Sequence, residues 1–404
     1  MFKRWVVLLT LRAARVWSIG ILAALSIVAC GDGGPQQVKV AVSVPLGLEI
    51  GHDMLHAAQL ALDEAGGQVG DVKVALLVFD TSDPDGSPIS PEWEQDVATL
   101  ASGDKAIVAY LGPPTSDQAR ASMAVLNEAS IVQLSQAATW PGLTKPGFGP
   151  GEPGKYYPTG RRHFFRLVPS DEVQGEVAAR WADWLHFRSV YVIDDGTAYG
   201  RGVAGIFELG ARDLGIEVLV VDSFDGGSAS PEALEGIAMR VADEQPELLF
   251  LGSSLGAGGE GLIAALRGLD PDVQIMVPDG MVQDQLITDL GAELVEGIYG
   301  TNVAVPAERL ESASRFRERY QAAYAKEPPP YAVTTYEAMQ VLLHAIERAE
   351  RPTREGVLAA VSDMEEFYGV LGRWQFDARG DISLTTISGM QIQDGAWTFF
   401  RILE

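Results

Sequence analysis

The sequence consists largely of two successive series of short apolar stretches, each followed by an amphipathic helical pattern. The expected strands lie at 38–44, 72–79, 106–111 and 131–134 in the first series and at 189–193, 217–221, 247–251 and 274–277 in the second. Strands that alternate with helices of this length form βαβ units and parallel sheets. The sequence therefore predicts an α/β fold with two doubly wound, Rossmann-like lobes.

The first thirty residues have the layout of an export signal. Four basic residues, Lys3, Arg4, Arg12 and Arg15, lie before residues 16–29, which form an uncharged and mostly apolar run of 14 residues. That run is shorter than the roughly 20 residues that span a bilayer as a helix. Cys30, the single cysteine of the chain, follows directly, and the arrangement resembles the bacterial lipobox, in which the cysteine is diacylated.

From this resemblance we expect residues 1–29 to be removed as a lipoprotein signal peptide and residues 30–37 to form a linker. The diacylated Cys30 would then anchor the protein to an extracytoplasmic membrane surface, because two acyl chains bind a membrane stably whereas a single chain binds it weakly. The alternative is a simple N-terminal membrane anchor that contains a cysteine.

The net charge of the chain, −25 at pH 7, argues against a nucleic-acid partner, because phosphates are bound by basic patches. Charge alone does not identify a ligand, since it affects solubility and steering rather than fold. With Cys30 lipidated, no intramolecular disulfide is possible, so the stability of the fold must come from packing.

Three patterns typical of catalytic or metal sites occur, and we discount each on its context. Residues 252–256 match the nucleophile elbow of serine hydrolases, but the downstream histidine, His344, lies in the middle of a predicted helix. Residues 256–261 match a dinucleotide-binding fingerprint, but the first glycine lies several residues past its strand. His52 and His56 could face one metal ion, but no third ligand is evident. We therefore predict a binding protein with no cofactor and no metal, not an enzyme.

Polar side chains follow several predicted strands at their carboxyl ends. They are Thr115, Ser116 and Thr139 in the first series and Tyr199 and Asp279 in the second. Each of them alone fits an ordinary helix cap or turn residue. Ligands of open α/β sheets bind at this edge beside helix N-termini, which also favour anions. Four such loops, distributed over both series, indicate a ligand site.

The chain from residue 38 to the 376–381 turn resembles the type I periplasmic binding proteins, specifically the branched-chain amino-acid-binding (Leu/Ile/Val-binding) family of ABC importers. The most specific matching segments are 135–144, 199–202 and 331–338. The resemblance implies a type I periplasmic binding fold that captures a small polar ligand, an amino acid or a similar compound. It also implies an ABC permease as partner and a monomeric protein.

The resemblance assigns roles to individual residues. The hydroxyls of Ser116 and Thr139 would donate to the α-carboxylate of the ligand, and Asp279 would accept from its α-ammonium in a charge-assisted bond. The other residues expected at the site are Thr115 at the same helix start as Ser116, the backbone around Ala137 beside the carboxylate, Tyr199 over the ligand, and Ile50 and Pro114 against its side chain.

The resemblance also divides the chain into two lobes joined by three crossing segments. Lobe one is expected to comprise 38–165 plus 302–370, and lobe two 166–301 plus 371–404. The expected crossings are 166–168, 300–303 and 369–374. Hinges of a few residues permit closure around a ligand.

Departures from the family pattern concern the ligand pocket. Ser82 and Thr115 stand where the family can carry the cysteines of a short disulfide. Ser253 and Ser254 stand near the position of an aromatic residue of the amino-acid pocket, and Trp140 changes the wall of lobe one. The identity of the ligand's side chain is therefore left open. The alternative function is a receptor of the same fold that presents its ligand to a membrane signalling partner.

Overall fold

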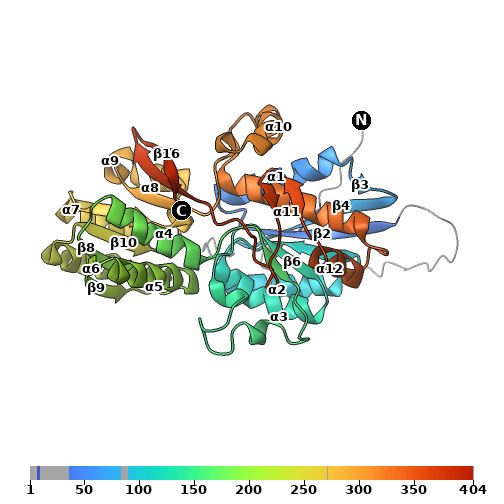
Figure 1. Cartoon of the computed structure of the whole chain (residues 1–404), viewed down its shortest axis with the longest axis horizontal. Coiled ribbons are helices and arrows are strands. Elements are labelled where there is room, and N and C mark those ends of the chain that lie inside the picture. Colours follow the sequence, from blue (N-terminus) through green and yellow to red (C-terminus); the bar gives the residue numbers. More distant parts are fainter. Residues whose placement is uncertain (1–6, 10–35, 83–89, 271, 404) are drawn as a thin grey trace, which may run out of the picture.

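The computed structural model describes residues 7–9, 36–82, 90–270 and 272–403. Within these ranges it contains two seven-stranded sheets, each with flanking helices, and a separate two-stranded hairpin. The two sheets lie in different halves of the molecule, the first at the right of Figure 1 and the second at the left. Cys30 and most of the expected signal peptide lie outside the described residues.

The first sheet has the strand order β1-β4-β2-β5-β6-β7, with β3 paired to β4. Its strands are β1 (Val7–Leu9), β2 (Gln37–Val44), β3 (Gln68–Val69), β4 (Val72–Asp80), β5 (Ile107–Leu111), β6 (Val132–Ser135) and β7 (Phe164–Arg166). All pairs are parallel except β3 with β4. Every residue of β5 is buried, as expected for a parallel strand covered by helices on both faces. Strand β1 belongs to the expected signal peptide.

Helices cover both faces of the first sheet, and their apolar residues form its core with the strands. In Figure 1, α1 and α11 lie above β2, while α2 and α3 lie below it. The helices of this half are α1 (Glu49–Glu64), α2 (Pro91–Gly103), α3 (Ser116–Glu128), α10 (Ser314–Tyr324), α11 (Pro330–Arg348) and α12 (Arg354–Ser362), with the short 3-10 turns η1 (Pro141–Leu143) and η2 (Gly154–Tyr156).

The second sheet has the order β16-β15-β12-β11-β10-β8-β9, with a parallel part from β9 to β12 and antiparallel strands β15 and β16 at one edge. Its strands are β8 (Ser189–Asp194), β9 (Glu217–Ser223), β10 (Leu248–Gly252), β11 (Gln274–Val277), β12 (Tyr299–Asn302), β15 (Ile387–Gln393) and β16 (Ala396–Leu403). Its helices are α4 (Asp171–Trp184), α5 (Ala198–Asp213), α6 (Pro231–Glu244), α7 (Gly259–Leu269), α8 (Asp284–Leu290) and α9 (Ala292–Val295), with the 3-10 turn η3 (Asp279–Met281). This arrangement and that of the first sheet are the doubly wound α/β fold that the sequence predicts.

The stretch expected to form the third crossing, 369–374, instead belongs to a hairpin of β13 (Phe367–Gly369) and β14 (Gly372–Trp374). The hairpin packs on α11, where the buried carboxylate of Glu337 accepts from the Trp374 Nε1–H at 2.6 Å and from the Val370 N–H at 2.8 Å. The chain joins the second sheet only at β15, so it passes between the halves in 375–386.

Two 3-10 turns, η4 (Ala307–Arg309) and η5 (Glu311–Ala313), precede α10. Leu310 has an extended backbone between the two turns, which interrupts the helical hydrogen bonding. The next helix, α11, begins at Pro330. Proline suits the first helical position, because the N–H that it lacks has no partner there.

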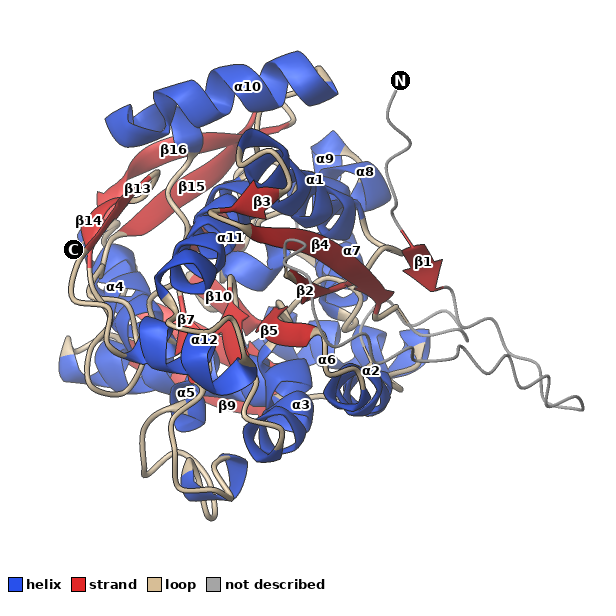
Figure 2. Cartoon of the chain, turned by 90° about the vertical axis from the view of Figure 1, so that its right-hand side faces the viewer, coloured by secondary structure: helices blue, strands red, loops and turns tan. Residues whose placement is uncertain are grey.

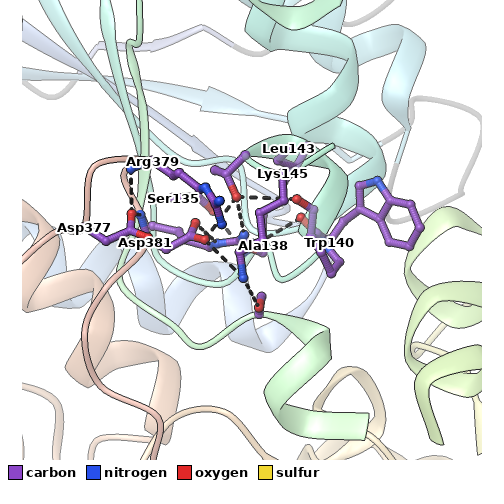
Figure 3. A network of polar contacts seen from close by, with 12 residues as sticks. Ser135, Ala138, Trp140, Leu143, Lys145, Asp377, Arg379 and Asp381 are labelled. Carbon is purple, nitrogen blue, oxygen red and sulfur yellow. Dashed lines mark hydrogen bonds and ion pairs between the residues drawn. The ribbon is translucent and has the colours of Figure 1, made fainter. Parts of the chain in front are cut away.

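A polar network joins two of the segments that pass between the halves. Arg166, fully buried at the end of β7, donates from Nε to Asp381 Oδ1 at 2.8 Å and from Nη2 to Thr144 Oγ1 at 2.7 Å. Figure 3 shows the turn that carries Asp377, Arg379 and Asp381 beside this network. Burial alone would raise the pKa of Asp381, but the charge and hydrogen bond of Arg166 outweigh burial and lower it.

Candidate functional site

A cavity of about 600 Å³ lies between the carboxyl ends of the strands of the two sheets. Its first wall comes from the loops after β2, β5 and β6, and its second wall from the loops after β8, β10 and β11. The lining includes all eight residues that the sequence singled out: Ile50, Pro114, Thr115, Ser116, Ala137, Thr139, Tyr199 and Asp279. The structure therefore brings these residues together, while their roles toward a ligand stay a prediction.

The first wall is organised by the start of α3. Thr115 caps the helix, since its Oγ1 accepts from the Gln118 N–H at 3.4 Å and donates to Gln118 Oε1 at 3.0 Å. Ser116 Oγ accepts from the Trp140 N–H at 3.0 Å, which joins the loop after β5 to the loop after β6. A hydroxyl that accepts one bond can still donate its own proton. Ser116 is thus fixed in place and keeps its proton for another acceptor.

Thr139 is the least satisfied group of this wall. Its side chain is 1% exposed, and Oγ1 has no hydrogen-bond partner among the described residues. Its own carbonyl oxygen accepts from the Asp171 N–H at 3.0 Å, which fixes the backbone there. Because buried polar atoms nearly always have a partner, the Thr139 hydroxyl is suited to a ligand oxygen.

Asp279 dominates the second wall. It is 3% exposed, and its carboxylate accepts at Oδ1 from the Tyr199 hydroxyl at 2.7 Å and at Oδ2 from the Tyr331 hydroxyl. Burial raises the pKa of Asp279, and the hydrogen bonds from Tyr331 and Tyr199 offset part of that rise. A carboxylate can accept about four bonds, so donors from a ligand can add to these two.

The contact between Tyr331 and Asp279 spans the cavity, because Tyr331 lies on α11 in the first half and Asp279 in the second. Tyr331 itself lines the cavity, although the sequence pattern gave it no role there. The contact of this side chain with a loop of the other half joins segments far apart in the sequence, so no local pattern could reveal it.

Asp171 is a second buried acid that the sequence pattern did not single out. It is fully buried behind Thr139, and neither carboxylate oxygen has a hydrogen-bond partner among the described residues. Burial raises the pKa of Asp171 to about 8, and the charge of Asp279 raises it further. The Thr139 hydroxyl lowers this pKa because it lies near the carboxylate, although the two groups form no hydrogen bond of normal geometry. In the sequence, Asp171 reads as an ordinary acidic residue in the first turn of a helix, where the helix dipole favours it.

Two glycines permit close packing at the cavity, Gly202 between the two walls and Gly280 within the second wall. A Cβ atom on Gly202 of α5 would lie 2.4 Å from the Trp140 ring of the first wall. A Cβ atom on Gly280 would lie 2.8 Å from the ring of Tyr199. Any other residue at these positions would displace an aromatic ring, so glycine sets the spacing here.

The other residues that the sequence analysis discussed make ordinary structural contacts. Ser82 Oγ accepts from the Gly47 N–H at 2.6 Å, and the His56 ring stacks on Tyr324 with centroids 4.1 Å apart. Ser254 lines the cavity, and the Ser253 hydroxyl donates to the Ser254 carbonyl. Within the described ranges, no group of three or more histidine, cysteine or acidic side chains could hold a metal ion. None of the helices described is both long and apolar enough to cross a membrane.

A larger hollow, of about 860 Å³, lies at the opposite end of the first sheet. Arg354, which lines this hollow, donates to backbone carbonyls, among them those of Ile107, Ser102 and Asp104 at 2.8–2.9 Å. Arg354 therefore ties the start of α12 to the loops below β5. The cavity at the carboxyl ends of the strands remains the candidate site, since open α/β sheets bind ligands there.

Residues 38–396 match the periplasmic binding protein family. The chain belongs to that family. It is accordingly an extracytoplasmic solute-binding protein. The Leu/Ile/Val-binding protein BraC3 of Rhizobium johnstonii is 27% identical over 346 residues, covering 84% of this chain and 86% of the relative. An amino acid binding protein of Pseudomonas aeruginosa is 25% identical over 335 residues, covering 81% of this chain and 82% of the relative.

Solved structures show the same fold. The leucine binding protein LivK of Thermotoga maritima aligns with a TM-score of 0.77 at 24% identity, covering 91% of this chain and 99% of that one. A solute binding protein of an ABC transporter from R. palustris, solved in complex with benzoate, aligns with a TM-score of 0.74 at 16% identity, covering 91% and 96%. The fold predicted from the sequence is confirmed.

Proposed function

We propose that this periplasmic binding protein captures an α-amino acid, or a compound with the same head group, and delivers it to an ABC permease. The observation that carries the proposal is the chemistry of the two walls. The unpartnered Thr139 hydroxyl and the Ser116 hydroxyl face the cavity from one side, and the Asp279 carboxylate faces it from the other. An α-carboxylate suits hydroxyls at the start of a helix, and an α-ammonium suits a buried carboxylate.

The relatives support an amino-acid ligand, since those named above bind Leu/Ile/Val or amino acids by their names. The benzoate complex shows why the fold alone is not sufficient support, because one scaffold serves different ligands. In our proposal, the residues of the cavity wall select the ligand, and the permease receives the closed protein.

Closure of the two lobes around the ligand is part of the proposal. Besides the pair of Tyr331 and Asp279, the Ala198 N–H at the start of α5 donates to Asp117 Oδ2 of the first half at 3.1 Å. A ligand stabilises the closed form only through contacts that the open form does not offer. We propose the lobes expected from the sequence, with the boundary at 370 moved to the end of β14 at Trp374.

The test is a thermal-shift screen of the purified protein with amino acids, guided by mass spectrometry of the small molecules that it releases. A ligand present at about 100 times its Kd stabilises the folded state by about 2.7 kcal/mol, which a melting curve resolves. We expect at least one α-amino acid to raise the melting temperature. If α-amino acids leave it unchanged while compounds without an ammonium group raise it, the proposal is wrong.

We also propose that Cys30 carries the lipid anchor, on the strength of its position after the basic and apolar leader. Labelled lipid should be incorporated into the wild-type protein and not into Cys30→Ser. Equal labelling of the two proteins, or a mature N-terminus elsewhere than residue 30, would refute the anchor and leave the ligand site untouched.

A further inference from the structure

The cavity lining has charge of one sign. Among the described residues, it carries the four carboxylates of Glu92, Asp117, Asp225 and Asp279 and no lysine, arginine or histidine. Only Asp279 is assigned to the head group of the proposed ligand. Three further acids therefore line the same cavity without a role toward the head group.

The three acids differ in how far their charge is compensated. Asp117 pairs with Arg120 Nη1 at 3.2 Å and accepts from the Ala198 N–H. Asp225 accepts from the neutral Ser228 hydroxyl at 2.7 Å, and within the described ranges neither Asp225 nor Glu92 forms a salt bridge. Both are exposed at the cavity rim, Glu92 in the first turn of α2 and Asp225 after β9. Their charges are thus the ones open to a ligand.

A neighbouring cavity of about 350 Å³ extends the negative surface. It shares Leu48, Ile50, Gln283 and Tyr331 with the first cavity. Its lining contributes five more acids, Glu49, Asp53, Asp284, Glu308 and Glu327, and one lysine. That lysine, Lys326, is already paired with Glu49 at 2.9 Å and with Asp53 at 2.6 Å.

Acidic residues on a surface do not make a site by themselves, but here they surround a cavity that contains an unpartnered polar group. The Thr139 hydroxyl is 1% exposed, lines the same cavity and has no hydrogen-bond partner among the described residues. A cleft lined by charge of one sign focuses its field on whatever enters. It attracts a cation and repels an anion such as a benzoate.

Building on the proposed head-group site, we infer that the ligand is a basic α-amino acid. Its α-ammonium lies at Asp279, and the ammonium or guanidinium of its side chain is drawn toward Glu92 and Asp225. The same charges oppose acidic amino acids and favour a basic side chain over a neutral one of equal size.

The test compares two ligands that differ in one charge. L-arginine and L-citrulline have side chains of nearly the same shape, but citrulline ends in a neutral urea group. Calorimetric titration of the wild-type protein should show arginine binding about tenfold more tightly, because several partly exposed carboxylates each contribute up to about fivefold. The preference should shrink as salt is added, since the rim charges are screened.

Variants then locate the effect. Glu92→Gln and Asp225→Asn should each weaken arginine binding by about 1.5- to fivefold and leave citrulline binding unchanged. Glu235→Gln, on the exposed side of α6, changes the net charge equally and serves as the matched control. We expect it to leave both affinities unchanged.

The outcomes separate this inference from the proposed function. If citrulline or leucine binds as tightly as arginine, the basic ligand is wrong and the amino-acid head group stands. If Glu92→Gln and Asp225→Asn weaken both ligands equally, these residues do not recognise the side-chain charge, and the inference also fails. If arginine, citrulline and leucine all fail to bind while compounds without an α-amino-acid head group bind, the proposed function fails and takes the inference with it.

Discussion

The two walls of the cavity hold their polar groups in opposite states. On the first wall, the neutral Thr139 hydroxyl is buried without a partner among the described residues. On the second wall, the charged Asp279 is already held by the hydroxyls of Tyr199 and Tyr331. The ligand would supply the missing hydrogen-bond partner of the first wall, whereas the carboxylate of the second wall is already oriented before a ligand binds. Orientation in advance lowers the entropy lost on binding, so we expect the second wall to contribute most of the affinity.

The largest expected effect is that of Asp279→Asn, which keeps the shape of the side chain and removes its charge. Breaking a buried charge pair typically costs about 3–5 kcal/mol, and loss of a bond to a charged group in a partly solvated site about 1.5–3 kcal/mol. We therefore expect affinity for an amino-acid ligand to fall more than tenfold in calorimetric titration. Asp243→Asn, which changes an exposed residue of α6, is the control and should bind the ligand as the wild type does. Binding of Asp279→Asn at wild-type affinity would show that no ammonium lies there.

Thr139→Val should have a smaller effect, because it removes one neutral hydrogen bond to the ligand. Such a bond contributes about 0.5–1.5 kcal/mol, so affinity should fall by about two- to tenfold. Since the hydroxyl has no hydrogen-bond partner among the described residues, the free energy of unfolding without ligand should be unchanged or slightly higher. A fall in that unfolding free energy by more than about 1 kcal/mol would instead show that the hydroxyl stabilises the fold.

The smallest expected effect is a dependence of affinity on pH. Burial raises the pKa of Asp279 in the free protein, whereas a bound ammonium favours the ionised carboxylate and lowers that pKa. Binding therefore releases protons, and affinity should weaken as the pH falls through the range in which Asp279 takes up a proton, by less than about tenfold per pH unit because a single group titrates. Titrations in buffers of different ionisation enthalpy measure the proton release. In Asp279→Asn this release should be lost, and proton uptake by the wild type would contradict the assignment.

The strand-end loops could be found from the sequence because the rule behind them is local. A strand, a polar loop and a helix start follow one another within a few residues, as at Thr115 and Ser116, and parallel strands present all such loops at one edge. For that reason eight residues scattered from Ile50 to Asp279 line a single cavity.

The parts that could not be predicted depend on contacts between distant segments. The hairpin of β13 and β14 packs on α11 because Glu337 of that helix accepts hydrogen bonds from N–H groups of the hairpin. No local sequence pattern predicts this contact. Asp171 has the sequence context of a helix start, and only the packing of α4 behind Thr139 makes it a buried acid. Tyr331 lies in the first turn of α11, and its partner is in the other half of the molecule.

The polar network of Arg166 has a mechanical consequence. Arg166 also donates its backbone N–H to the Gly380 carbonyl at 3.0 Å, so the first and last connecting strands are clamped side by side at two points. In Figure 2 the β13–β14 hairpin, after which the last connection begins, lies at one side of the molecule, away from β2 and β4. Two connecting segments joined in this way have to rotate together as one rigid unit when the lobes move. We expect the two lobes to open and close about a single axis. A permease would then meet the same surface of the closed protein whatever side chain the bound ligand carries.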